Sequence, residues 1–235
     1  MKNTEFIFTL AISYLVMLSM ILAVNKLKPG LTLHHRLCPA NFPALNYLHI
    51  VGVVVMLLIP FMAAPLPVYL FSFPGKVSIV QASCFLLCFL AFLFFPWRDF
   101  SRNDHKTGNG MSSLPAVLLY GSLRSVFLIS YEWFFRGLLL WCFSLWVGAI
   151  WAIIINILLY TLIHIHKRKN ELIGCIPFGL LVCVFTLWWQ SVWPAIIFHL
   201  EIMMIHEWPL LKKFISQKNK PRYEHISNRS HGLYR

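Results

Sequence analysis

The chain has 235 residues, of which 59% are hydrophobic and only 12% are charged. A soluble domain carries about 25% charged residues, so this composition excludes a water-soluble protein and predicts one polytopic membrane bundle. The formal net charge of +12 does not indicate a nucleic-acid partner, because the basic residues lie between and after apolar runs, as membrane topology requires. We expect a multi-pass protein whose surroundings are the lipid bilayer.

Seven apolar runs approach the ~20 residues that a helix needs to cross the hydrocarbon. They cover residues 5–24, 47–63, 77–96, 113–146, 148–166, 172–189 and 192–209. The first run is followed by no small-residue cleavage site, so we expect an uncleaved span. The fourth run is too long for one straight crossing. We expect residues 114–124 to lie along the membrane interface and to lead into a span near 125–146.

The basic residues assign an orientation to these spans. If the amino terminus faces out, the loops after the first, third and fifth spans and the carboxyl tail hold nearly all lysines and arginines. Only Lys2 and Lys76 fall outside, while Arg124 and Arg136 lie within the fourth run. The positive-inside rule therefore predicts seven transmembrane helices, amino terminus out and carboxyl terminus in. We expect an all-α bundle with a three-helix region (1–112), a core (113–209) and a basic cytoplasmic tail (210–235).

An acid and a base interrupt the fourth run. A charged side chain at mid-depth costs roughly 2.5–3.5 kcal/mol on insertion scales, so such residues are rare and usually functional. Glu132 and Arg136 are four residues apart and share one face of a helix. They form either a structural ion pair that helps the helices to pack or part of a functional site.

Two further helices bring polar side chains into the membrane. The fifth carries Asn156, Tyr160 and His164, and the seventh carries His199, Glu201 and His206. A single intramembrane histidine is usually a hydrogen-bonding group between helices. A carboxylate together with histidines from separate helices also supplies what peptide hydrolysis needs, a base that activates water and donors that hold the oxyanion.

Depth along the helices gives a partial check of this cluster. At 1.5 Å per residue, Glu132 lies about 12 Å from Arg124, His164 about 5 Å from Lys167 and His199 about 20 Å from Lys212. These depths fit one cavity that opens inward, with His199 deeper than the others. His206 matches the depth of His164 better. For Glu201, a polar contact to a neighbouring helix or a protonated carboxyl is favoured over a catalytic role.

Three motifs resemble one family. They are Glu132-Trp-Phe-Phe-Arg136-Gly137, then Tyr160-Thr-Leu-Ile-His164, then Val192-Trp-Pro-Ala-Ile-Ile-Phe-His199. In order, gaps and apolar setting they resemble the CAAX-protease and bacteriocin-processing family of intramembrane proteases (CPBP, or Abi). The pattern of that family is Glu-Glu-x-x-x-Arg, Phe-x-x-x-His and His-x-x-x-Asn. The resemblance covers about residues 115–207.

The chain departs from the pattern at three positions. Tyr131 replaces the first glutamate, Met203 replaces the final asparagine, and Tyr160 replaces phenylalanine. A tyrosine has a pKa of about 10 and cannot take over the role of a carboxylate at neutral pH. Glu132 is turned about 100° from position 131 around an α-helix, and a kink would be needed to turn it to the same side.

The resemblance implies an intramembrane endopeptidase in which Glu132, His164 and His199 are the catalytic candidates. Arg136, Tyr160, Tyr131 and Met203 would support them, with Glu201 and His206 as auxiliary candidates. No cofactor is certain; if a metal takes part, zinc would be held by Glu132, His164 and His199. The partner would be a peptide or membrane-protein substrate, and the location the cytoplasmic membrane of a bacterium.

Two alternatives stay open. The first is a catalytically silent relative that binds peptides or partners, for example in bacteriocin immunity or envelope processing, and the exchanges at Tyr131 and Met203 favour it. The second is a small transporter that uses the same buried charges as an ion path. The preserved Glu132, Arg136 and two histidines favour the protease.

Overall fold

The computed structural model describes residues 2–27, 42–63, 72–100, 114–167 and 169–218, and every regular element in these ranges is a helix. The helices are α1 (Lys2–Leu27), α2 (Phe42–Val53), η3 (Val54–Leu58), α3 (Ile59–Ala63), α4 (Ile79–Phe100), α5 (Leu114–Glu132), η5 (Trp133–Leu139), α6 (Leu140–Val147), α7 (Ala149–Ile163), α8 (Lys169–Trp189) and α9 (Trp193–Lys218). The all-α fold class is confirmed.

Several of these helices join end to end into longer rods. The elements α2, η3 and α3 form one rod, and α5, η5 and α6 form another, of which η3 and η5 are π-helical. Among the described residues four rods are long and apolar enough to cross a membrane: Glu5–Lys26, Pro43–Met62, Leu114–Val147 and Lys169–Trp189. Shorter apolar helices cover Ile79–Leu93, Ala149–Ile163 and Trp193–Ile205. The predicted apolar runs thus each become one rod.

The fourth run differs from its prediction. Residues 114–124 are not a separate interfacial segment, because α5 continues through Arg124 into Glu132 without a break. The apolar helix extends over 34 residues to Val147. It ends where Gly148 takes φ +81°, a backbone conformation that glycine adopts without strain, and α7 starts at the next residue.

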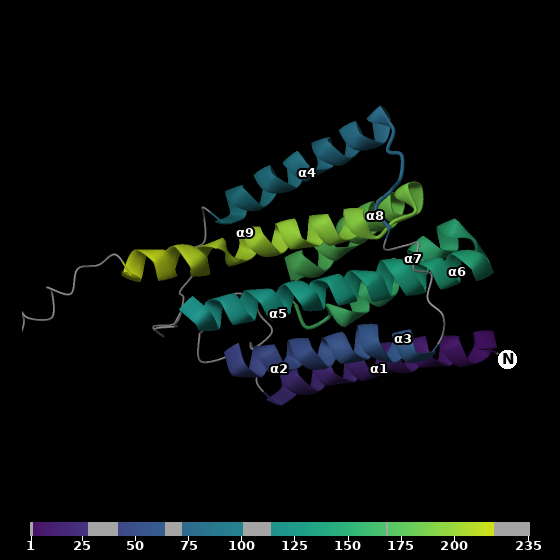
Figure 1. Cartoon of the computed structure of the whole chain (residues 1–235), viewed down its shortest axis with the longest axis horizontal. Coiled ribbons are helices and arrows are strands. Elements are labelled where there is room, and N and C mark those ends of the chain that lie inside the picture. Colours follow the sequence, from purple (N-terminus) through teal and green to yellow (C-terminus); the bar gives the residue numbers. More distant parts are fainter. Residues whose placement is uncertain (1, 28–41, 64–71, 101–113, 168, 219–235) are drawn as a thin grey trace, which may run out of the picture.

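Successive rods run in alternating directions along the bundle (Figure 1). The amino terminus lies at one end, and α9 continues towards the opposite end. That second end also receives the carboxyl end of α1 with Lys26, the amino end of α5 and the turn between α7 and α8 with Lys167 and Lys169 (Figure 1). The described basic residues that the sequence assigned to the inside therefore meet at one end.

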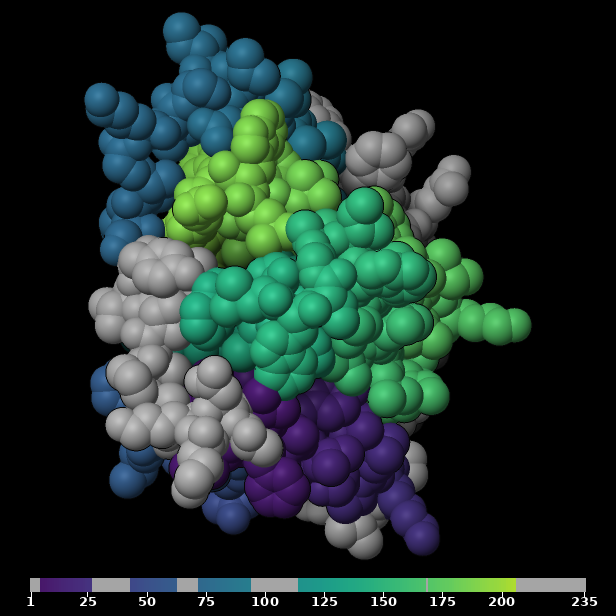
Figure 2. Space-filling model, turned by 90° about the vertical axis from the view of Figure 1, so that its right-hand side faces the viewer, coloured from purple at the N-terminus to yellow at the C-terminus, as the bar shows by residue number. Residues whose placement is uncertain are grey.

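The rod of α5, η5 and α6 forms the centre of the bundle. Every residue from Ser130 to Leu140 is buried. In the end view of Figure 2 the teal atoms of α5 and α6 lie between the purple atoms of α1 and the yellow-green atoms of α9. A helix that is apolar on all sides belongs in the middle of a bundle, so the acid and base of this rod are held away from lipid.

The first helices of the chain pack directly on this central rod. Gly52 of α2 lies so close to α5 that a Cβ at this position would overlap the ring of Phe127. Tyr14 of α1 donates a hydrogen bond of 3.0 Å to the carbonyl of Leu159 in α7. The α9 helix extends past residue 209, where the sequence predicted the start of the tail.

Candidate active site

The π-helical segment η5 starts directly after the Tyr131–Glu132 pair. A π-helix spreads its turn over more residues than an α-helix and occurs mostly at functional sites. Both Tyr131 and Glu132 are buried. Asn156 of α7 supports η5 from the side, since its Nδ2 donates a 2.6 Å hydrogen bond to the carbonyl of Phe135. Cys183 of α8 in turn donates to Asn156 Oδ1 over 3.3 Å.

Glu132 is fully buried and contacts a base on each side. Arg136 Nη1 lies 3.3 Å from its Oε2 and 3.4 Å from its Oε1. The Arg136 guanidinium also lies 4.3 Å from the centroid of the Tyr160 ring, a cation–π contact. The positive charge is thus held by a carboxylate and an aromatic face, which offsets part of the cost of burial.

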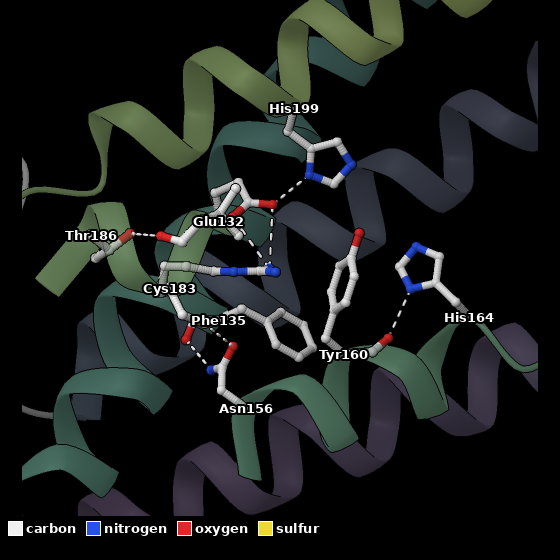
Figure 3. Close-up of polar contacts among 10 residues, drawn as sticks. Glu132, Phe135, Asn156, Tyr160, His164, Cys183, Thr186 and His199 are labelled. Atoms are coloured by element: carbon white, nitrogen blue, oxygen red, sulfur yellow. Dashed lines mark hydrogen bonds and ion pairs between the residues drawn. The ribbon is translucent and has the colours of Figure 1, made fainter. Parts of the chain in front are cut away.

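The second partner of Glu132 is His199 from α9. His199 Nδ1 forms a hydrogen bond and ion pair with Glu132 Oε1 (Figure 3). A carboxylate only accepts, so Nδ1 carries the hydrogen and donates. In the neutral ring Nε2 is then the free acceptor. His199 also lines a cavity, whereas Glu132 does not.

His164 approaches the same cavity from the end of α7. Its Nδ1 lies 2.9 Å from the carbonyl of Tyr160 and donates to it, which leaves Nε2 as the acceptor of the neutral ring. Figure 3 shows the hydroxyl end of Tyr160 pointing towards the space between the rings of His164 and His199. The structure therefore brings together Glu132, Arg136, Tyr160, His164 and His199, as the motifs predicted.

Tyr131 lies between the two histidines. Its ring centroid is 6.2 Å from that of His164 and 5.8 Å from that of His199, with each histidine ring perpendicular to it. Its hydroxyl is buried and has no hydrogen-bond partner among the described residues. The residue that replaces the first glutamate of the family pattern therefore faces the same cavity as both histidines.

The cavity has a volume of about 170 Å³. One wall is apolar and comes from α1 and α2, with Met17, Met20, Ile21, Val24, Leu45 and Leu48. The opposite wall comes from α5, α7 and α9. Arg124, His166 and Lys167 also line the cavity. Burial lowers the pKa of Lys167 to about 8.

His49 of α2 also lines the cavity, although the sequence patterns did not single it out. It is a single histidine inside the second apolar run. That position is the signal that could have drawn attention to it, because intramembrane ionisable residues are functional candidates by default.

The three proposed metal ligands do not form a metal site. No group of three His, Cys, Asp or Glu side chains in the described part of the chain is placed to hold a metal ion. The Nδ1 atoms of His199 and His164 are also engaged with Glu132 and with the Tyr160 carbonyl. The proposed reaction uses no metal, and zinc binding by Glu132, His164 and His199 stays a prediction.

The remaining candidates lie apart from the cavity. Glu201 is buried, and neither of its carboxyl oxygens has a hydrogen-bond partner among the described residues. Met203 is buried in α9. Neither side chain lines the cavity. His206 belongs to α9, but its side chain lies outside the described part of the structure.

Residues 107–204 match the family model for type II CAAX prenyl endopeptidase Rce1-like. This match, in a bundle of apolar helices, supports a protein of the intramembrane protease kind. No curated protein and no solved structure matches the chain. The matched segment includes all three motifs, which confirms the resemblance to a divergent CPBP-family protease.

Proposed function

We propose that the chain is an intramembrane endopeptidase that hydrolyses a peptide bond with water activated by His199, and that Glu132 positions this histidine. The proposal rests on the different positions of these two residues. His199 reaches the cavity, and the fully buried Glu132 holds its Nδ1 from behind. A carboxylate in this place fixes the tautomer of the ring and stabilises the imidazolium that forms during the reaction.

The proposed reaction starts with a water molecule between the two histidines. His199 Nε2 takes a proton from the water, and the water oxygen forms a bond to the carbonyl carbon of the substrate. His164 Nε2 accepts the second hydrogen bond of the water and orients it. Positioned general bases of this kind contribute about 10²- to 10⁴-fold to a rate.

The tetrahedral intermediate then needs a donor and an acid. The buried Tyr131 hydroxyl donates a hydrogen bond to the negative oxygen, and it does so as a neutral phenol. The carbon–nitrogen bond breaks as the carbonyl re-forms. Protonated His199 transfers its proton to the leaving nitrogen, which returns the site to its starting state.

A second candidate function follows from the same tyrosine. The Tyr131 ring stands where the family pattern has a carboxylate, and it contacts both histidine rings. If this ring excludes the attacking water, the chain binds peptides or partner proteins without cleaving them. This is the silent relative that the sequence left open.

A cleavage assay in membranes distinguishes the two functions. Wild type and the variants Glu132→Gln, His164→Ala, His199→Ala and Tyr131→Phe are compared at matched protein levels against a panel of co-expressed membrane peptide reporters. We expect wild type to cleave, and we expect Glu132→Gln and His199→Ala to lose at least about 100-fold in rate. Tyr131→Phe, which keeps the ring and removes the oxyanion donor, loses about 10²- to 10³-fold.

Glu201→Gln is the matched control, because Glu201 is a buried acid on α9 that does not line the cavity. Its cleavage rate is expected to equal that of wild type. An inactive wild type whose Tyr131→Glu variant cleaves would contradict the protease proposal and would establish the silent relative. The proposed location is a bacterial cytoplasmic membrane with the cavity facing the cytoplasm, which the presence of Arg124 and Lys167 in its lining supports.

A further inference from the structure

Seven of the 17 described residues that line the cavity belong to helices that precede the segment matched by the family model. That segment begins at residue 107, whereas the apolar wall belongs to α1 and α2. The wall includes two methionines, Met17 and Met20. Methionine is flexible and polarizable, and it adapts to apolar side chains of different shapes. This wall faces Tyr131 and His199 across the cavity, so a molecule held there lies beside the proposed reacting groups.

Several buried polar atoms on the lining lack partners among the described residues. Two of them are His49 Nδ1 and the Tyr131 hydroxyl. His49 is only 6% exposed and its ring packs against Phe127 and Tyr120, at centroid distances of 5.3 Å and 5.6 Å. A buried polar group without a partner is unfavourable. Both atoms therefore favour a ligand that brings hydrogen-bonding groups into an otherwise apolar space.

A peptide main chain fits this lining better than a lipid chain does. Each amide unit offers both a donor and an acceptor, which can satisfy either tautomer of His49. An acyl chain brings no polar group to this depth and would leave His49 and Tyr131 without partners. The apolar side chains of such a peptide would meet Met17, Met20 and their neighbours.

We propose that α1 and α2 form a binding subsite for an apolar segment of the peptide substrate, in which His49 hydrogen-bonds the main chain and Met17 and Met20 contact the side chains. The proposal rests on the proposed function for the nature of the ligand, but binding at this wall does not require cleavage. The chemistry of the amino-terminal helices then determines which sequences the site accepts.

The test is photo-cross-linking of a defined peptide to the full chain. The probe is an acetylated and amidated hexapeptide of leucine and alanine that carries one benzophenone side chain. The protein, with His199→Ala to prevent cleavage, is reconstituted in vesicles of phosphatidylethanolamine and phosphatidylglycerol. We expect adducts on α1 and α2, centred on Met17 and Met20, that an excess of the unlabelled peptide removes.

Four substitutions in this background sharpen the test. Met20→Trp fills the cavity and is expected to lower labelling at least tenfold. Leu15→Trp is the matched control on the same helix, because Leu15 is 59% exposed and does not line the cavity. His49→Phe keeps the ring stacking but removes both nitrogens, and we expect the peptide to compete about tenfold less well. His49→Gln is expected to recover part of this loss.

A second probe and a second wall position distinguish a peptide site from a lipid site. If a photoreactive fatty acid labels Met17 and Met20 and the peptide does not displace it, the wall is a lipid site and the proposal is overturned. The proposal is also overturned if the peptide labels Met20→Trp and Leu48→Trp as strongly as it labels the control Leu15→Trp. Peptide labelling of the wall in a chain that never cleaves would reject the proposed function while supporting the subsite.

Discussion

Glu132 is fully buried and does not line the cavity, so any effect of its carboxyl group on a bound molecule passes through a neighbouring residue. Arg136 and His199 contact its two sides, and the cavity meets only His199. This arrangement explains how one acidic residue fits both interpretations of the motif. It is the partner of a buried ion pair and, in the proposed reaction, also the group that orients the base His199.

The ion pair gives the first prediction at the residue scale. Arg136→Met leaves the Glu132 carboxylate buried beside His199 alone, and we expect it to destabilise the protein by about 3–5 kcal/mol. The double variant Arg136→Met with Glu132→Gln removes both charges and should regain most of this loss. Thermal unfolding of the detergent-purified protein measures both effects.

Lys76→Met is the control for this series, because Lys76 is exposed. Its unfolding should lie within about 0.5 kcal/mol of wild type. A double variant as unstable as Arg136→Met alone would show that the arginine contributes through its contact with Tyr160 rather than through the charge of Glu132.

At the scale of elements, the close contact between α2 and α5 determines the shape of the cavity. Small residues let helices approach closely in membranes. Gly52 does so opposite Phe127, the residue on which the ring of His49 packs. The position of the α2 wall therefore depends on a glycine.

Gly52→Ala tests this contact. The new Cβ would overlap the ring of Phe127, so the ring has to move, and we expect a loss of about 1–3 kcal/mol in stability. Gly121→Ala on α5 is the matched control, since no neighbouring atom lies within 4 Å of the Cβ there. Thermal unfolding of the two variants should separate them clearly. Equal unfolding temperatures would mean that α2 does not rely on this close approach.

The sequence predicted the helices and the residues of the three motifs but placed His199 at the wrong depth. The depth of Glu132 was counted from Arg124 and the depth of His199 from Lys212. This count treats both basic residues as markers of the membrane interface. In the structure α5 starts at Leu114 and α9 continues to Lys218. His199 Nδ1 contacts Glu132 Oε1, so the two residues lie at the same level of the bundle.

The π-helical segment and the cavity could not be predicted from the sequence, for a physical reason. A π-helical turn has i→i+5 hydrogen bonds. Whether it forms depends on tertiary packing around residues such as Gly137, where a Cβ would lie 3.3 Å from Val192. A cavity wall made by α1 and α2 depends on how distant segments pack. Neither feature leaves a periodic signal in the sequence. The sequence patterns therefore did not single out His49.

At the scale of the whole molecule, the rods alternate in direction, so the amino end of α1 and the carboxyl end of α9 lie at opposite ends of the bundle (Figure 1). The carboxyl end of α1, the amino end of α5 and the turn between α7 and α8 lie towards the same end as the carboxyl end of α9. This agreement supports the predicted orientation, with the amino terminus outside, because the positive-inside rule and the direction of the helices are independent of each other.

Reporter fusions in a bacterial host test this orientation. A green fluorescent protein at the carboxyl terminus should fluoresce, and alkaline phosphatase fused after Lys76 should be active, because only the second site lies outside. Alkaline phosphatase fused after Lys106 is the matched control in an inside loop and should be inactive. Phosphatase activity at the carboxyl terminus would reverse the predicted topology.

The hydrogen bond from Tyr14 to the Leu159 carbonyl has a practical consequence. It fastens the first helix of the chain to the helix that ends at His164. The segment matched by the family model is therefore not expected to form the complete cavity when it is expressed alone. A truncated chain that starts at residue 107 would keep every motif residue, yet its cavity would lack the wall from α1 and α2 and would open to lipid.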